Sequence, residues 1–397
     1  MKDERVEEDR AYMRRAIELA DRGWGRVHPN PLVGAVVVRD GVVVGEGYHA
    51  EYGGPHAEVV ALEQAGEAAR GATVYVTLEP CTHQGKTPPC TLALRRAGIA
   101  RLVYGAEDTN PKARGGAEQL RQAGIAVHGG VEREAVRAQN AMFFHAVERG
   151  STYVALKFGL TLDARIAEMP GWGGAVTGPE SHAEVHRLRA GFDAILVGIG
   201  TALADDPQLT VRGAVVPRTP PRRIVLDAAA RLPLDSKLAR TAADVPVWLF
   251  CAEDASAERR AALQRAGLRI LTVPRGPAGL ELEPVLDRLW TEGIRSVLCE
   301  GGAQLGASLL AADRVQRLYL FLAPRLFGER GVLAFPGRFP PQVADGWEYA
   351  RAVPCGRDLL AVLDRRRSED VPYGHGRPVP PDAAQSGGRG RGVSGAD

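Results

Sequence analysis

The sequence predicts a protein of two α/β domains, and three observations lead to this fold class. Strand-like and helix-like segments alternate along the chain, which favours a parallel or mixed sheet covered by helices. The chain has 397 residues, whereas one domain usually contains about 100–200 residues. Hydrophobic residues make up 45% and charged residues 25% of the chain, so there are enough apolar side chains for two cores.

The first domain is expected at residues 1–148. Apolar side chains at three- and four-residue spacing predict a helix over residues 10–20, which Gly23 would end. Two β-rich runs follow in PLVGAVVVRDGVVVGEGYH, and their Asp40-Gly41 junction is typical of a hairpin turn. The remaining elements alternate: the helix HAEVVALEQAG, the strand ATVYVTLEP, the helix CTLALRRAG, the strand IARLVYGAED, the helix GGAEQLRQAG with a strand after it, and one helix in EREAVRAQNAMFFHAVERG.

A second α/β domain is expected at residues 149–366. A new strand pattern begins in STYVALKFGLTLDARIA. Buried-type strands follow in DAILVGIG, RRIVLDA, VPVWLFC, RILTVP, RSVLCEGG and RLYLFLAP, with helical stretches between several of them. Residues 367–397 are rich in Pro, Gly and Arg and contain little to bury, so we expect a disordered tail.

Charge and composition exclude several classes of function. The net charge is +2, which provides no general attraction for nucleic acid or for an anionic membrane. The N-terminus lacks the apolar core of a signal peptide, and no run of eighteen uncharged apolar residues is present. Five Cys residues are too few for a disulfide scaffold. A cytoplasmic protein with free or metal-bound thiols is therefore expected.

Four residues of the first domain follow the pattern of the zinc deaminases, H-x-E and a later P-C. His56 and Glu58 stand at the start of a predicted helix, and Cys81 follows a strand at an expected strand-to-helix turn. His56, Cys81 and Cys90 would hold Zn²⁺ and leave a fourth position for water, while Glu58 would carry protons. Two loop thiols beside a helix-capping His are the alternative interpretation, and His83 is a competing candidate ligand.

The stretches HPNPLVGAVVV, PHAE, VTLEPCTHQGKTPPC and DTNPKARG resemble the bifunctional deaminase/reductase family of riboflavin biosynthesis. The resemblance implies a cytidine-deaminase-like α/β/α domain with one Zn²⁺ per chain. It also implies a pocket for a pyrimidine that carries ribose 5-phosphate, lined by Asn30, His49, Lys86, Asp108 and Asn110. The charge of Lys86 alone suits a phosphate, although a solvated loop cation is the alternative.

The second half is similar to the reductase domain of the same family, which resembles dihydrofolate reductase and uses NADPH. The stretches DAILVGIGTALADDPQLTVR and SVLCEGGAQLGASLL carry this similarity. It implies that substrate is bound by Arg189, Leu209, Arg212 and Glu300, with both arginines on the phosphate. It implies that the cofactor is bound by Lys157, Gly159, Thr201, Asp205 and Gly302. By itself, the Gly-Gly turn indicates either a phosphate site or a packing turn.

Four positions depart from the family pattern in one segment. Ala164 replaces a Gly, and because Ala disfavours positive φ we expect this loop to differ. Gly173 replaces a Ser, Ala175 replaces a Trp expected beside the cofactor, and His182 stands where Arg is common. Trp172 is nearby, but its register is wrong for the missing Trp. These changes bear on whether the reductase is active.

Three functions therefore remain open. The first is a homo-oligomeric bifunctional enzyme that deaminates 2,5-diamino-6-(5-phosphoribosylamino)pyrimidin-4(3H)-one and then reduces the ribosyl group to ribityl. The second is a deaminase with a non-catalytic reductase-like domain. The third is a nucleic-acid base deaminase, which the absence of a basic stripe with interleaved aromatic residues disfavours.

Overall fold

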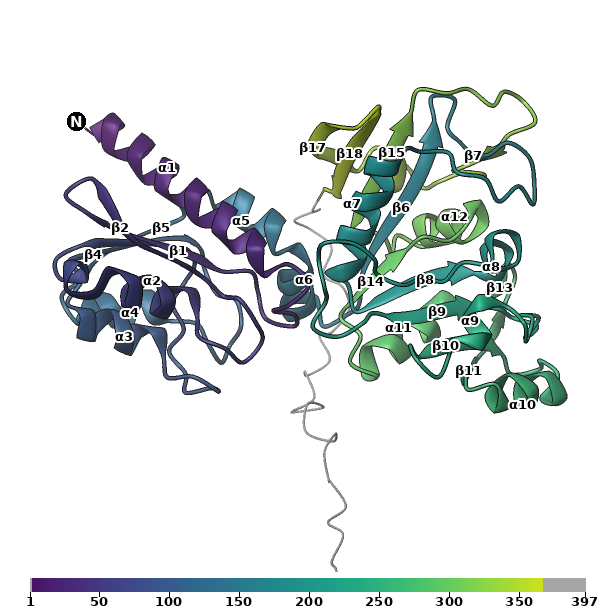
Figure 1. The fold of residues 1–397 in the computed structure, drawn as a ribbon, viewed down its shortest axis with the longest axis horizontal. Coiled ribbons are helices and arrows are strands. Elements are labelled where there is room, and N and C mark those ends of the chain that lie inside the picture. Colours follow the sequence, from purple (N-terminus) through teal and green to yellow (C-terminus); the bar gives the residue numbers. More distant parts are fainter. Residues whose placement is uncertain (1, 367–397) are drawn as a thin grey trace, which may run out of the picture.

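The computed structural model describes residues 2–366, which form two α/β lobes that meet near α6 (Ala141–Arg149) (Figure 1). The first lobe contains a five-stranded sheet in the order β2-β1-β3-β4-β5, and the second a nine-stranded sheet in the order β11-β10-β9-β8-β14-β6-β15-β18-β17. The α/β class predicted from the sequence is confirmed. The expected disordered tail at 367–397 lies outside the described residues.

The strands of the first lobe follow the predicted alternation. They are β1 (Gly34–Arg39), β2 (Val42–Tyr48), β3 (Thr73–Leu78), β4 (Arg101–Ala106) and β5 (Ala126–Gly129). Between and around them lie α1 (Lys2–Ala20), η1 (Asp21–Gly23), α2 (Ala57–Ala65), η2 (Gly66–Ala69), α3 (Cys90–Ala97), α4 (Gly116–Gln122), α5 (Arg133–Gln139) and α6. The predicted hairpin is confirmed, because β1 and β2 are antiparallel and Asp40 and Gly41 both have positive φ, at 51° and 78°.

The sheet of the first lobe separates two layers of helices. On one face α1 packs Met13, Ala16 and Leu19 against the sheet, and α5 lies beside α1 (Figure 1). On the other face α2, α3 and α4 cover Ala35 and Val37, which alternate with the residues of β1 that face α1. The helix predicted at residues 10–20 extends back to Lys2. In this extension buried Asp9 accepts hydrogen bonds from Tyr75 and Arg101, which fasten it to the sheet.

The single helix predicted after β5 is interrupted at Asn140. This residue ends α5 and precedes α6. Its buried side chain accepts a hydrogen bond from Leu32 N at 2.7 Å and donates one to Leu32 O at 3.0 Å. The break is therefore stabilised by a connection to the loop that leads into β1, which helical periodicity cannot predict.

The second lobe contains the six strands predicted from its hydrophobic runs and several more. Its strands are β6 (Tyr153–Thr161), β7 (Arg165–Ala167), β8 (Ala194–Gly198), β9 (Arg222–Leu226), β10 (Val247–Ala252), β11 (Arg269–Val273), β12 (Arg275–Gly276), β13 (Gly279–Leu280), β14 (Ser296–Cys299), β15 (Arg317–Ala323), β16 (Val332–Leu333), β17 (Trp347–Cys355) and β18 (Asp358–Arg365). The strands from β11 to β15 across the large sheet are parallel, and β18 and β17 add an antiparallel edge.

Helices cover both faces of the large sheet. They are α7 (Pro179–Ala190), α8 (Ile199–Asp205), α9 (Lys237–Arg240), α10 (Ala257–Arg265), α11 (Leu282–Thr291), α12 (Ala303–Ala311) and α13 (Pro341–Ala344). The segment directly after β8 forms the short helix α8. Ile199 and Ala202 of this short helix pack into the core beneath it.

The two lobes share a packed interface. The Trp24 indole donates a hydrogen bond from Nε1 to Arg187 O at 2.7 Å, and it occupies the space that a side chain at Gly191 would need. His28 Nε2 lies 2.8 Å from the Asp193 carboxylate. Apolar side chains of α6 join Trp24 in the same core cluster as α7. The lobes are thus joined by buried apolar surface as well as by polar contacts.

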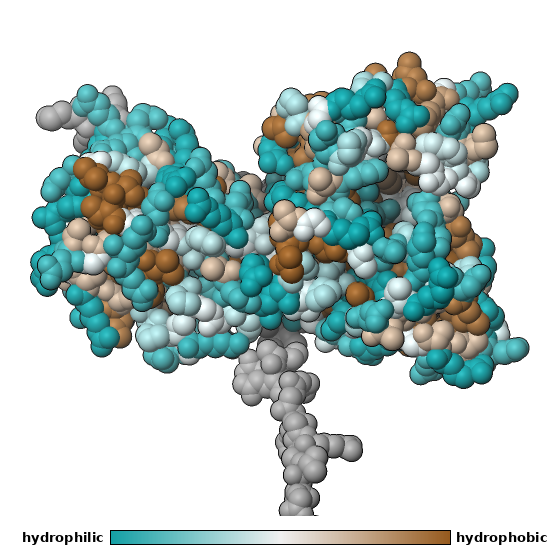
Figure 2. Space-filling model, viewed as in Figure 1, coloured by the Kyte–Doolittle hydropathy of each residue, from teal (hydrophilic) through white to brown (hydrophobic). Residues whose placement is uncertain are grey.

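The surface is mainly hydrophilic on the face shown in Figure 2, and its apolar residues form separate small patches. Among residues 2–366, no helix has both the length and the apolar character needed to cross a membrane.

Candidate active sites

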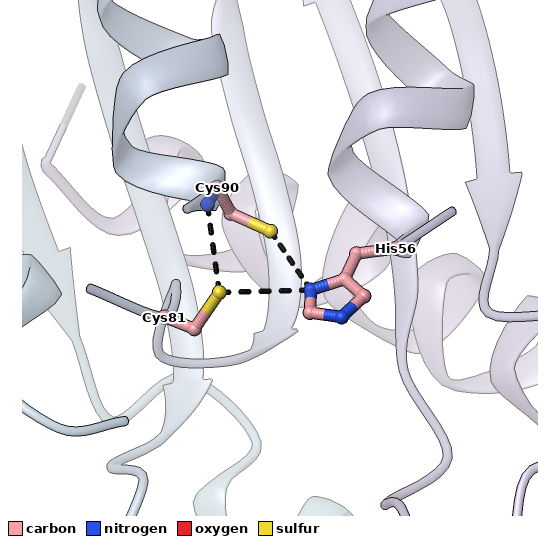
Figure 3. Close-up of side chains that lie close together, drawn as sticks. All are labelled: His56, Cys81 and Cys90. Atoms are coloured by element: carbon pink, nitrogen blue, oxygen red, sulfur yellow. Dashed lines mark hydrogen bonds between the residues drawn. The ribbon is translucent and has the colours of Figure 1, made fainter. Parts of the chain in front are cut away.

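His56, Cys81 and Cys90 come together beyond the C-terminal end of β3, the central strand of the first sheet, and point toward a common centre (Figure 3). Their ligand atoms all lie within 4.8 Å of one another. His56 Nδ1 is 3.1 Å from Cys90 Sγ and 3.6 Å from Cys81 Sγ. Tetrahedral zinc with Zn–N and Zn–S distances of ~2.0 and ~2.3 Å would separate such atoms by roughly 3.5 Å. The donor set and spacing therefore fit zinc with a fourth position open.

Local structure explains how three distant segments reach this centre. His56 is the N-cap of α2, and Cys90 is the first residue of α3. Cys81 follows β3 but does not open a helix as predicted, because the loop continues through residues 82–89 before α3 begins. The N-terminus of α3 nevertheless faces Cys81, since Cys90 N donates a hydrogen bond to Cys81 Sγ at 3.4 Å. Gly116 permits this loop to pack closely, as a Cβ there would lie 1.8 Å from Pro80 O.

The pKa values of the Cys81 thiol and the Glu58 carboxyl are shifted in opposite directions. The hydrogen bond from Cys90, supported by His56, lowers the pKa of the Cys81 thiol well below its usual range despite burial. Glu58 lies in the first turn of α2 and is only 3% exposed. Burial raises the pKa of its carboxyl. A carboxyl beside a candidate metal centre can both accept and donate a proton, as general acid–base catalysis requires.

A cavity of about 260 Å³ opens onto this centre. All the pocket residues implied by the family resemblance line it: Asn30, His49, Lys86, Asp108 and Asn110. Asn30 Nδ2 is 3.2 Å from His49 Nε2, and His49 Nδ1 is 2.9 Å from Pro55 O. Burial raises the pKa of Asp108 to about 6. His83 also lines the cavity, but among the described residues the group close enough to share an ion contains only His56, Cys81 and Cys90.

Sequence reasoning missed Glu79, Tyr52 and Phe143, which also line this cavity. Buried Glu79 accepts hydrogen bonds from the main-chain N–H groups of Asp108, Gly115 and Ala117 at 3.3, 3.2 and 2.9 Å. It therefore fixes the loop that carries Asp108. Glu79 belongs to the TLEPC stretch that carries Cys81, and this position in the motif could have indicated that it lies near the site. The sequence contains no signal for Tyr52 and Phe143, because only the tertiary fold brings these side chains to the cavity.

A second cavity, of about 360 Å³, lies in the second lobe. It opens where β8, β14 and β6 end, the edge at which parallel α/β sheets bind ligands. Lys157 Nζ lies 3.1 Å from Glu300 Oε2, and Arg189 pairs with the same carboxylate through Nε and Nη2 at 2.5 and 2.9 Å. Burial alone would raise the pKa of Glu300, but the two cations outweigh it and lower this pKa to about 2.

Most of the residues implied for the reductase line this second cavity: Lys157, Gly159, Arg189, Thr201, Asp205, Arg212, Glu300 and Gly302. Thr201 Oγ1 accepts a hydrogen bond from Gly302 N at 2.8 Å and joins α8 to the Gly-Gly turn. Burial raises the pKa of Asp205. Leu209 lines an adjoining cavity, which it shares with Arg189 and Arg212. Its φ of 52° turns the chain at this point.

The departures from the family pattern have different consequences. Ala164 has a φ of 56°, so the expectation that Ala prevents a positive-φ turn is wrong. Asp163 maintains this turn by accepting hydrogen bonds from Thr161 Oγ1 and from Gly328 N at 2.5 and 2.7 Å. Ala175 and His182 line the second cavity. Trp172 packs its ring against Phe327, with ring centroids 5.4 Å apart, and is not among the residues that line the cavity.

The fold and the two sites define a chain with a zinc-type deaminase domain followed by a reductase domain. Residues 6–106 match the family described as the cytidine and deoxycytidylate deaminase zinc-binding region, and residues 152–360 match the RibD C-terminal domain. The chain belongs to the RibD family of riboflavin biosynthesis proteins, with deaminase and reductase activities.

Individual relatives support this assignment along most of the chain. The RibD protein of Aquifex aeolicus is 43% identical over 81% of this chain and 88% of its own length, and that of Escherichia coli is 40% identical over 83% and 92%. Acinetobacter baumannii RibD superposes with a TM-score of 0.77 at 34% identity, covering 91% of this chain and 100% of its own. A solved deaminase/reductase from Thermotoga maritima gives 0.76 at 34% identity, covering 91% and 99%.

Proposed function

We propose that the first domain hydrolyses the exocyclic amine of 2,5-diamino-6-(5-phosphoribosylamino)pyrimidin-4(3H)-one and that the second reduces the ribosyl group of the product to ribityl with NADPH. The Thermotoga maritima relative is described as a diaminohydroxyphosphoribosylaminopyrimidine deaminase and 5-amino-6-(5-phosphoribosylamino)uracil reductase. The observation that carries the proposal is the presence of two separate polar cavities in one chain, one at the His56, Cys81 and Cys90 centre and one at the Glu300 ion network. We assign deamination to residues 1–148 and reduction to residues 149–366.

For the deaminase step, we assign proton transfer to Glu58. One zinc ion bound by His56, Cys81 and Cys90 would supply a water whose pKa is lowered to about 7. Glu58 accepts a proton at its carboxylate as the C–O bond forms, and it returns that proton to the nitrogen as the C–N bond breaks, so that water and amine become carbonyl and ammonia. Its burial excludes bulk water from this transfer.

The polar residues of the first cavity suit a phosphoribosyl pyrimidine. Asn30 and His49 are held by each other and by Pro55 O, so they are oriented before the ligand arrives. Asp108 can accept a hydrogen bond from an N–H group of the pyrimidine, because a pKa of about 6 leaves its carboxyl mainly ionised at pH 7. We assign the 5-phosphate to Lys86, an exposed cation on the loop between Cys81 and Cys90.

The reduction uses the second cavity. NADPH would supply the hydride to C1′ of the opened sugar, and we place this cofactor against Gly159, Thr201 and Gly302. Lys157 and Asp205 are the polar groups that we assign to proton transfer. Arg189 and Arg212 would bind the substrate phosphate, and Glu300 would orient both Arg189 and the pyrimidine. The intact ion network at Glu300 favours an active reductase over a retired domain.

The deaminase half is tested with Glu58→Gln in the full-length protein. This substitution keeps the shape of the side chain but removes its proton exchange, so ammonia release should fall by about 10²–10⁴-fold. Zinc content, measured by elemental analysis, should remain at one ion per chain, while His56→Ala and Cys90→Ser should lower it. Full ammonia release by Glu58→Gln would contradict the role of Glu58, and unchanged zinc in both ligand variants would contradict the metal site.

A further inference from the structure

A residue of the second domain reaches the deaminase cavity through an aromatic ring. Tyr52, which lines that cavity, has two cations over its ring. Lys86 Nζ lies 4.1 Å from the ring centroid and comes from the deaminase loop between the two Cys residues. Arg218 Cζ lies 4.8 Å from the same centroid and comes from the segment before β9 in the second lobe. Tyr52 is thus a direct physical connection between Arg218 and the proposed phosphate-binding lysine.

The main chain around Arg218 is fixed to the first lobe independently of its guanidinium. Arg218 N donates a hydrogen bond to Gly25 O at 2.9 Å. The guanidinium adds a hydrogen bond from Nη2 to His28 O at 3.1 Å. Tyr52 N donates to Arg26 O at 3.2 Å, so the ring and the guanidinium are anchored to the same loop. That loop continues to Asn30 in the deaminase cavity.

The side chain of Lys86 also contacts the backbone turn at Gly53. It passes across Gly53, where a Cβ would lie 3.2 Å from Lys86 Cδ and where φ is 86°. The ammonium group then lies over the Tyr52 ring. Because a lysine side chain has many rotamers, orienting its ammonium group before the ligand arrives saves entropy on binding. If the Tyr52 ring were mobile, it could not orient the Lys86 ammonium group, and this saving of entropy would be lost.

We propose that Arg218 is a positioning residue of the deaminase site, which acts through Tyr52 on Lys86 and thereby on recognition of the substrate phosphate. The inference rests on the proposed function, because it uses the phosphoribosyl substrate. It gives the reductase domain a part in substrate binding for the first reaction rather than in proton transfer, because the contacts of Arg218 lead through Tyr52 to Lys86. The contribution is small, as expected for an exposed cation–π contact.

The test compares Arg218→Ala with Arg218→Lys in the full-length protein. Arg218→Ala retains the main-chain hydrogen bond to Gly25, so the fold should persist. We expect the KM for the diaminopyrimidine ribotide to rise about two- to fivefold, with kcat for ammonia release unchanged. Arg218→Lys, which keeps a cation at the ring, should restore most of the loss. Arg269→Ala is the matched control, because it removes a cation 4.7 Å from the Trp248 ring elsewhere in the second lobe.

Three further measurements separate positioning from a general structural effect. In a Tyr52→Leu background, Arg218→Ala should have no additional effect on this KM. With the dephosphorylated nucleoside as substrate, Arg218→Ala should match the parent. NADPH oxidation with the deaminated intermediate should also be unchanged.

An unchanged ribotide KM in Arg218→Ala, additive effects with Tyr52→Leu, or an equal loss with the nucleoside would each overturn the inference. If the parent protein itself released no ammonia, the proposed function would fail first, and that result is distinct from all three.

Discussion

Glu300 shows how one buried side chain can be both a structural and a binding group. Its carboxylate is 6% exposed and contacts Lys157 and Arg189. Two cations facing one carboxylate leave a net positive charge in the cavity, which suits an anionic ligand. Without the carboxylate, both cations would lose the ion pairs that they form with it, and Asp205 would remain as an opposite charge for Lys157. Burying unpaired charge is among the most destabilising changes available to a protein.

Glu300→Gln should therefore lower the free energy of unfolding at pH 7 by on the order of 3 kcal/mol. The folded chain lowers the pKa of Glu300 from 4.5 to about 2. Its stabilisation is thus complete above pH 4.5 and is lost as pH falls toward 2. Urea unfolding from pH 7 to pH 3 should show the parent approaching the variant as pH decreases. A constant difference across this range would contradict the account; Glu283→Gln, at an exposed ion pair with Arg314, is the control.

The backbone conformation of Ala164 should have a measurable cost in stability. An Ala in the left-handed region is strained relative to Gly, and here the turn is maintained by the hydrogen bonds to Asp163. Ala164→Gly should increase the free energy of unfolding by about 1 kcal/mol. The measurement is a higher midpoint of thermal unfolding. Ala167→Gly, in the short strand β7, should instead destabilise the protein. A decrease in stability for Ala164→Gly would mean that the turn is not strained.

At the scale of elements, the first cavity depends on a helix break rather than on a helix. Asn140 separates α5 from α6 and holds both main-chain groups of Leu32. Leu32 lies two residues after Asn30, and the same loop turns through the main-chain hydrogen bond from Asn30 N to Val27 O at 2.9 Å. A side chain on the last helices of the first lobe therefore positions a loop near its beginning.

Asn140→Ala should destabilise the protein by about 3 kcal/mol, because it leaves two buried main-chain groups of Leu32 without partners. The affinity of the deaminase cavity should fall as well, since the Asn30 loop loses its support. Calorimetry and the ribotide KM measure the two effects. Gln122→Ala removes an exposed hydrogen bond to Glu118 and serves as the control, with a change below about 0.5 kcal/mol. Equal stability of Asn140→Ala and this control would be inconsistent with the described connection.

At the scale of the whole molecule, much of the fold could be predicted because its signals are local. The hairpin at Asp40 and Gly41 and the buried strands of the second lobe are encoded in short stretches of sequence. The same holds for the candidate zinc ligands, whose spacing reflects the chain geometry between β3 and α3. Hydrophobic periodicity did not indicate the break at Asn140 or helix α8, because each depends on contacts with segments distant in sequence.

The contacts between the lobes were beyond sequence reasoning for the same reason. Trp24, His28 and Arg218 carry no motif, and their partners lie far along the chain. The positive φ of Ala164 was missed because intrinsic preference was weighed without the hydrogen bonds of Asp163, which compensate for the strain. Motifs therefore located the reacting groups, whereas tertiary contacts determine how those groups are held.

The central claim is that one chain performs both reactions in order. The most direct measurement supplies purified, zinc-loaded protein with the diaminopyrimidine ribotide and NADPH and follows ammonia and NADPH oxidation in the same sample. We expect ammonia release first and then NADPH oxidation approaching one equivalent per ammonia. Ammonia without NADPH oxidation, even when the deaminated intermediate is supplied directly, would contradict the reductase assignment, and the absence of ammonia would contradict the deaminase assignment.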